Sequence, residues 1–186
     1  KIAYILGGVG LIGTEITKAL FSAGATVIVL DSDKIKLNNF KKKYNLNKNI
    51  YFEYFNVSKI EKIEKSFYKL NAKYGLPDIL INCTYPRTND LAKNNFDELT
   101  YNSFEKNIKI HLGSYILIAR ISAEVMKKNN IKGSIIQLSS IYGLVGQDLS
   151  IYKNTKMREN ITYSTIKGGI NNATKSMCSY YGKYNI

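Results

Sequence analysis

Two residues near the end of the chain have the types and the spacing of an acid/base pair. Tyr163 and Lys167 stand four positions apart, which places both side chains on one face of a helix. A free tyrosine has a pKa of about 10, too high for a general base near neutral pH. An ammonium group one helical turn away favours the phenolate and brings a tyrosine closer to that range. The pair therefore predicts proton transfer to or from a substrate oxygen.

The same spacing occurs twice more, because the chain holds 15 tyrosines among many lysines. Tyr44 and Lys48 lie at the end of an expected exposed, lysine-rich helix, and we attribute their spacing to chance. Tyr152 and Lys156 are a genuine alternative, but a polar, loop-like stretch follows them. The C-terminal pair is followed instead by two glycines, which let a helix pack closely on a sheet or a cofactor. We therefore favour the C-terminal pair.

A serine, the single histidine and two cysteines are the other candidates for chemistry. Ser140 follows a short apolar run, and at the carboxyl end of a parallel strand its hydroxyl is placed to hold a substrate oxygen. Because His111 is the only histidine, zinc sites built from several histidines are excluded, and a Ser-His-Asp triad has one imidazole to use. Cys83 and Cys178 are far apart, so neither a disulfide framework nor a metal site is expected.

Three glycines stand where the phosphates of a dinucleotide would need them. Gly7, Gly10 and Gly13 follow an expected strand at 2–6 and open an expected helix. Glycine there permits a tight turn, close approach of the backbone to a pyrophosphate, and close packing of the helix on the strand. The helix N-terminus then offers free N–H groups to the phosphates. We predict a dinucleotide site, the alternative being a purely structural turn.

Asp31 indicates which dinucleotide would bind. It ends the second expected strand, 18 residues after Gly13, close to the spacing of an acid that binds ribose. A carboxylate accepts hydrogen bonds from both ribose hydroxyls and repels the extra phosphate of NADP, by about a few kcal/mol at an effective dielectric constant of about 20. Lys34 is close enough to host a phosphate, so NADP stays an alternative. We favour NAD.

The elements that must position these residues alternate along the chain. Apolar, β-branched runs predict strands at 2–6, 26–30, 50–55, 78–82 and 134–138. Helical patterns lie between them at 12–23, 35–44, 58–74 and 103–128, and a last helix starts near Thr162. Ser58 is expected to cap the third helix. This alternation predicts an α/β fold, a Rossmann-like, doubly wound parallel β-sheet between two helix layers.

Composition limits the class of protein. The 186 residues suit one domain, and no apolar stretch is long enough to cross a bilayer, so we expect a cytoplasmic protein with no membrane role. The chain opens at Lys1, which predicts missing N-terminal residues. The net charge of +13 is spread along the sequence, which favours an anionic small substrate over nucleic acid.

An ordered set of motifs runs through the chain: Gly7-x-x-Gly10-x-x-Gly13, Asp31, Asn56-Val57, Leu80-Ile81-Asn82, Ser139-Ser140 and Tyr163-x-x-x-Lys167. In this order the chain resembles the short-chain dehydrogenase/reductase family over essentially its whole length. The resemblance implies that Tyr163 is the acid/base, that Lys167 also binds the nicotinamide ribose, and that Ser140 orients the substrate oxygen. It further implies that Asn56 and Val57 flank the adenine and that Asn82 supports the sheet. The implied cofactor site also includes Leu11, Ile12, Ser32 and Cys83.

Several positions depart from the family pattern. Leu6 replaces a usual threonine, Cys83 and the residue after it replace Asn-Ala, and the glycine spacing is that of the sugar-nucleotide branch. His111 stands where most members have a catalytic asparagine. Either it holds a water against Lys167 and passes a proton to solvent, or it is an ordinary helix residue. About ten residues near 151–160 are inserted, and we expect them to form a flap at the mouth of the active site.

Four segments indicate a narrower group within the family: 85–87, 111–115, 139–143 and the insertion. They are similar to the flagellin-modification oxidoreductases found with bacterial legionaminic and related nonulosonic acid pathways. That similarity implies a sugar substrate, phosphorylated or nucleotide-linked. It makes Arg87 and Tyr142 candidate substrate contacts, although an arginine in such a loop is as often a simple surface charge.

The expected function is therefore NAD-dependent carbonyl/alcohol oxidoreduction on a sugar or sugar-nucleotide-like substrate. A nucleotide-sugar epimerase or dehydratase with tightly bound NAD, and a non-catalytic NAD-binding module, are the alternatives. The family also implies a homodimer or homotetramer formed through the helices near 103–128 and 162–184. Its members continue with further strands, so we expect 1–186 to be a single NAD(P)-binding Rossmann domain that is C-terminally incomplete.

Overall fold

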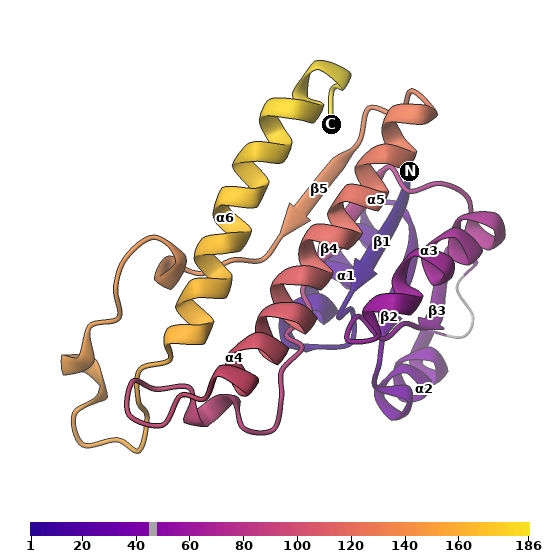
Figure 1. Ribbon diagram of the computed structural model, residues 1–186. Helices are drawn as coiled ribbons and strands as arrows, with labels where there is room; N and C mark the ends of the chain where they lie inside the picture. Colours follow the sequence, from indigo (N-terminus) through magenta and orange to yellow (C-terminus); the bar gives the residue numbers. More distant parts are fainter. Residues whose placement is uncertain (45–47) are drawn as a thin grey trace.

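A computed structural model describes residues 1–44 and 48–186. Its five strands are listed here in chain order: β1 (Ile2–Leu6), β2 (Thr26–Asp31), β3 (Ile50–Tyr54), β4 (Ile79–Asn82) and β5 (Ser134–Gln137). They form one parallel sheet with the order β3-β2-β1-β4-β5 (Figure 1). The predicted Rossmann-like sheet is confirmed, and each predicted strand agrees with the observed one to within one residue at either end.

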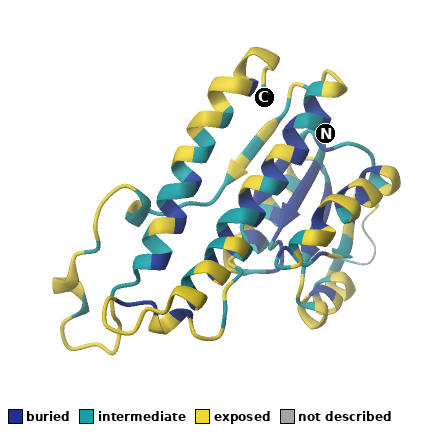
Figure 2. Ribbon diagram, viewed as in Figure 1, coloured by how far each residue is buried: buried dark blue, intermediate teal, exposed yellow. Residues whose placement is uncertain are grey.

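Helices cover both faces of this sheet. Alternate side chains of β1 point to opposite faces, as the pleat of a strand requires. Ala3 and Ile5 pack with side chains of α1 (Leu11–Ser22) and α2 (Lys34–Tyr44). Tyr4 and Leu6 pack on the other face, with α3 (Ile60–Tyr74) and α5 (Ser114–Lys128). The inner strands are buried on both faces (Figure 2), which explains their uninterrupted apolar sequences.

The last long helix, α6 (Ile161–Tyr181), lies beside α5. A small apolar cluster joins them: Tyr115 from α5 and Ile166 and Ile170 from α6 are buried together. Short 3-10 helices occupy the connecting segments: η1 (Leu91–Lys93), η3 (Ile141–Gly143), η4 (Leu149–Tyr152) and η5 (Gly182–Tyr184). No helix in the described part of the chain is both long and apolar enough to cross a membrane.

Two sequence predictions about helices were wrong in detail. The helix predicted at 103–128 begins at Tyr101 and is interrupted: α4 (Tyr101–Asn107) passes into a π-helical segment, η2 (Ile108–Gly113), before α5. Such wide turns often mark functional sites. Ser58 does not cap α3, which begins at Ile60. The Ser58 N–H instead donates to Asn56 Oδ1 at 2.9 Å, a local turn that competes with a helix cap.

Candidate active site

The strand order reverses between β1 and β4, and a crevice opens where the chain leaves these two neighbours. The glycine turn after β1 forms one wall. Gly7 has a φ of +72°, which only glycine adopts without strain. A Cβ atom on Gly13 would lie 2.1 Å from the Gly7 carbonyl oxygen, so any side chain there would force the turn apart. The turn is held to the sheet by the Gly7 N–H, which donates to the Leu30 carbonyl at 2.8 Å.

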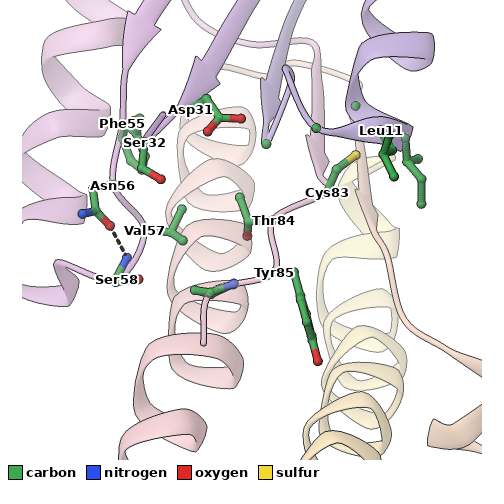
Figure 3. A pocket seen from close by; sticks show the side chains of 15 residues that line it. Leu11, Asp31, Ser32, Phe55, Asn56, Val57, Ser58, Cys83, Thr84 and Tyr85 are labelled. Atoms are coloured by element: carbon green, nitrogen blue, oxygen red, sulfur yellow. Dashed lines mark hydrogen bonds between the residues drawn. The ribbon is translucent and has the colours of Figure 1, made fainter. Parts of the chain in front are cut away.

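A cleft of about 420 Å³ lies along this turn. Side chains from the ends of β2, β3 and β4 and from the start of α1 surround it (Figure 3). Ten of the predicted cofactor-binding residues line it: Gly7, Gly10, Leu11, Ile12, Gly13, Asp31, Ser32, Asn56, Val57 and Cys83. Three other predicted cofactor residues, Asn82, Tyr163 and Lys167, are not part of its lining.

Asp31 is fixed by the backbone around it. Its Oδ2 accepts a hydrogen bond of 3.3 Å from the Val9 N–H in the glycine turn, and its Oδ1 accepts one of 3.0 Å from the Asp33 N–H. The carboxylate therefore has a set orientation at the edge of the cleft. Lys34 is the residue that left NADP as an alternative cofactor. Its ammonium lies 5.0 Å from the centre of the Tyr54 ring.

The first turns of α6 position Tyr163 and Lys167. Asn160 caps the helix, because its Oδ1 accepts the Tyr163 N–H at 2.8 Å. The Lys167 side chain is 5% exposed and its ammonium donates to the Leu138 carbonyl at 2.8 Å. The same ammonium lies 5.7 Å from the centre of the Tyr163 ring. Burial lowers the pKa of Lys167 to about 8, so its charge is costly to hold in this site.

Ser140 is brought to the same turn of α6. The hydroxyl of its neighbour Ser139 donates to the Lys167 carbonyl at 3.0 Å. A Cβ atom on Gly143 would lie 2.5 Å from the Lys167 carbonyl carbon, so η3 packs directly on the helix backbone. Ser140 Oγ accepts the Tyr142 N–H at 3.2 Å, which leaves its own hydroxyl proton available to donate.

Tyr85 joins this group to the cleft. Its side chain lines the cleft, and its ring stands edge-on to Tyr163, with 5.9 Å between ring centres. It also stands edge-on to His111 at 5.2 Å, and His111 in turn lies 5.3 Å from Tyr115. We call Tyr85, His111, Tyr115, Tyr163 and Lys167 the catalytic cluster. Its members come from the loop after β4, from η2 and the adjoining α5, and from α6.

His111 lies in the π-helical segment and is 1% exposed. Within the described residues its Nε2 atom has no hydrogen-bond partner. Burial, reinforced by the positive charge of Lys167, lowers the pKa of His111 to about 3. The imidazole is therefore neutral at physiological pH, which fits a hydrogen-bonding group better than a group that itself takes up the proton.

The competing tyrosine–lysine pairs are arranged differently. Tyr152 ends the short helix η4, and Lys156 follows in an exposed, irregular stretch, so their spacing does not place them on one helix face. Tyr44 is the last residue of α2, and Lys48 lies beyond that helix. Tyr152 contacts Tyr142 instead, with 3.4 Å between the two hydroxyl oxygens.

A second pocket, of about 570 Å³, adjoins the catalytic cluster. We call it the outer pocket; its lining residues are Tyr85, Arg87, Thr88, Asn89, Leu91, Ala92 and Asn160. Tyr85 belongs to both the cleft and the outer pocket. The Arg87 guanidinium lies over the Tyr85 ring, 5.2 Å from its centre. Arg87 thus lies beside the site, and Tyr142 lies in η3, which packs on α6, with its hydroxyl next to that of Tyr152.

Sequence reasoning missed two functional positions. Tyr85 was identified only within a family-like segment, because no periodic pattern distinguishes a loop tyrosine. Tyr115 likewise appeared only within the segment 111–115, yet its hydroxyl donates to the Thr84 carbonyl at 2.7 Å and fixes the segment after β4. Its place four residues after the unusual His111, one helical turn away, is the signal in the sequence that could have found it.

Comparisons with known proteins agree with this geometry. A family model described as short chain dehydrogenase matches residues 1–186. Post-translational flagellin modification protein A of Campylobacter coli is 28% identical over 173 residues, which cover 92% of this chain and 67% of that protein. The 2-dehydro-3-deoxy-D-gluconate 5-dehydrogenase of Formosa agariphila is 26% identical over 190 residues, which cover 100% of this chain and 66% of that protein.

Solved structures give the same result. A crystal structure of a short chain dehydrogenase from Leptospira borgpetersenii with bound NAD+ matches with a TM-score of 0.80 and 26% sequence identity, over 100% of this chain and 67% of that chain. The chain thus spans about two thirds of the length of these relatives. The family resemblance and the narrower similarity to flagellin-modification oxidoreductases are both confirmed.

Proposed function

This chain belongs to the short-chain dehydrogenase family of NAD(P)-dependent oxidoreductases, and we propose that it interconverts an alcohol and a carbonyl on a sugar-like substrate with NAD(H). One observation carries the proposal. The Tyr163 ring, the buried Lys167 ammonium and the Ser140 turn meet on one end of α6, next to the glycine-lined cleft.

The cleft fits a dinucleotide for steric reasons. Gly7, Gly10 and Gly13 line the cleft without side chains, so the backbone of the turn is open to close approach by phosphates. The Leptospira relative binds NAD+. Asp31 supports NAD over NADP, because its carboxylate is held at the cleft by backbone N–H groups and would repel a 2′-phosphate.

We assign the chemical steps as follows. NAD, when bound, takes up or supplies the hydride. Ser140 donates a hydrogen bond from its hydroxyl group to the substrate oxygen and so orients it, without giving up the proton. Tyr163 takes the proton from the substrate alcohol in oxidation and returns it to the carbonyl oxygen in reduction. The Lys167 ammonium stabilises the phenolate from within the same low-dielectric site.

We assign His111 a hydrogen-bonding role beside Lys167. Its imidazole is buried and neutral, and its Nε2 is unpaired within the described residues, so it is able to accept or donate one hydrogen bond in the cluster. This assignment explains why a histidine is tolerated where the family usually has an asparagine amide. We favour it over the alternative in which His111 is an ordinary helix residue, because the imidazole contacts Tyr85 and Tyr115 and its Nε2 is unpaired within the described residues.

The substrate class follows from the relatives and the outer pocket. One relative is named for flagellin modification and another for a dehydrogenation of a deoxygluconate. The outer pocket is lined by threonine, asparagine, arginine and tyrosine side chains, which suit hydroxyl groups. We also propose that 1–186 forms one NAD(P)-binding domain and that copies of the protein associate through α5 and α6, where Ile116 and Tyr180 are exposed.

The test is Tyr163→Phe, with sugars and sugar acids as substrates and NADH absorbance as the readout. We expect turnover to fall by about 10³-fold, because general acid–base catalysis contributes on that order. Binding of NAD should be unchanged by fluorescence titration. Tyr152→Phe is the matched control and should keep most of the activity. Equal losses in both variants would exclude the assignment, and turnover without net NADH would favour an epimerase or dehydratase.

A further inference from the structure

The outer pocket opens next to the reacting groups rather than at a remote surface. Its inner wall is Tyr85, whose ring touches Tyr163 edge-on, with 5.9 Å between ring centres. A substrate with its reacting carbon at Tyr163 would therefore extend its remaining carbons past Tyr85 into this pocket. The face of a tyrosine ring is a suitable surface for the apolar face of a sugar.

Among the described residues that line the outer pocket, Arg87 is the one that carries a charge at neutral pH. Its charge is not neutralised by a carboxylate: within the described residues no ion pair involves Arg87. Arg158 makes the contrast clear, because it pairs with Asp97 at 2.7 Å and with Glu159 at 3.4 Å. Arg87 is held instead over the Tyr85 ring, 5.2 Å from its centre. This contact orients the guanidinium and leaves its positive charge unpaired with any carboxylate among the described residues.

The wall that carries Arg87 is fixed to the rest of the fold. The next residue, Thr88, donates its N–H to Asn107 Oδ1 at 3.0 Å, and Asn107 Nδ2 donates to Thr88 Oγ1 at 2.7 Å. Asn107 is fully buried in α4. On the opposite side, Asn160 Nδ2 donates to the Leu91 carbonyl at 2.7 Å. These bonds hold the outer pocket in shape before a substrate arrives, which lowers the entropy cost of binding.

From these observations we infer that the outer pocket selects a polyol or sugar that carries an anionic group, a phosphate or a carboxylate, which Arg87 binds while Tyr85 packs against the carbon chain. A guanidinium binds either anion through two parallel N–H donors. This inference rests on the proposed function, because it assumes that the reacting carbon lies at Tyr163. It makes Tyr85 and Arg87 the residues that determine specificity.

The test measures binding by calorimetry to the protein saturated with NADH, using sorbitol, sorbitol 6-phosphate and gluconate as probes. We expect one of the two anions to bind at least about tenfold more tightly than sorbitol, the difference that a charge-assisted hydrogen bond provides. The identity of the tighter-binding anion then shows whether Arg87 recognises a phosphate or a carboxylate. Arg87→Gln should remove that advantage and leave sorbitol binding within about twofold.

Arg120→Gln is the matched control, because it makes the same change at an exposed arginine on α5. It should leave the binding of every probe unchanged. If no anion binds more tightly than sorbitol to the unmodified protein, or if both arginine variants lose anion binding equally, the inference is wrong. Failure of the proposed function gives a different result: Tyr163→Phe would stay active, whereas the two arginine variants would still report on anion binding.

Discussion

The nucleotide half of the molecule, residues 1–82, and the catalytic half, residues 83–186, are built by different means. In the first half, the glycine turn follows β1 directly, Asp31 is the last residue of β2 and Asn56 comes just after β3, so the pairing of these strands aligns them. In the second half, the catalytic cluster comes from a loop, a π-helical segment and two helices. The insertion between η3 and α6 is largely exposed (Figure 2).

The two halves depend on different physical effects, steric in the nucleotide half and electrostatic in the catalytic half. The nucleotide half needs close backbone approach, which a single Cβ atom would prevent. The catalytic half needs polar groups held out of water, at an electrostatic cost that the rest of the fold must offset. We therefore expect substitutions in the glycine turn to act through steric exclusion and substitutions in the catalytic cluster to act through charge.

Among the effects on cofactor binding and stability, the largest is expected for Gly13→Ala. Its new Cβ atom would clash with the Gly7 carbonyl oxygen, 2.1 Å away, and would spread the turn. We expect NAD affinity to fall by about 100-fold or more and the free energy of unfolding to fall by about 1–3 kcal/mol. Fluorescence titration and thermal melting measure both. Gly146→Ala is the control, because nothing lies within 4 Å of a Cβ atom there. An unchanged NAD affinity in Gly13→Ala would show that the turn does not cradle phosphates.

An intermediate effect is expected for Asp31→Ser. This change removes the carboxylate that repels a 2′-phosphate and leaves a small hydroxyl at the cleft. We expect the ratio of NAD affinity to NADP affinity to fall by about 10- to 100-fold, equivalent to about 1.4–2.8 kcal/mol. Competitive titration with the two cofactors gives the ratio. Asp33→Ser is the control, because it removes a carboxylate two residues away that does not line the cleft. A similar fall in the affinity ratio in that variant would show that the effect comes from the overall charge and not from the position of Asp31.

The smallest effect is expected on stability, for Lys167→Met. Burial lowers the pKa of Lys167 to about 8, against an ordinary value of 10.5, so below pH 8 the folded protein holds an unfavourable charge. We expect Lys167→Met to be inactive but more stable at pH 7, by about 1–2 kcal/mol, because the loss of the bond to the Leu138 carbonyl offsets part of the gain.

The pH dependence has a definite sign. Between about pH 8 and 10.5 the unfolded chain keeps the Lys167 proton while the folded protein has released it, so the lysine form gains stability as the pH rises. The advantage of Lys167→Met should therefore shrink across this window in denaturant melts. Lys175→Met, at an exposed position on the same helix, is the control. An advantage that stays constant with pH would show that packing, not charge, causes it.

The sequence by itself determined the sheet, the glycine turn and the tyrosine–lysine pair on α6, because each depends on local spacing: strand alternation, three glycines, and one helical turn. Only the tertiary structure decided that Tyr85 joins the cleft to the outer pocket, that Tyr115 fixes the segment after β4, and that the long helix contains a π-helical segment at His111. These features arise from packing between segments far apart in the chain. A single sequence has no periodic signal for such contacts, because the side chains involved become neighbours only after the sheet and α6 have come together.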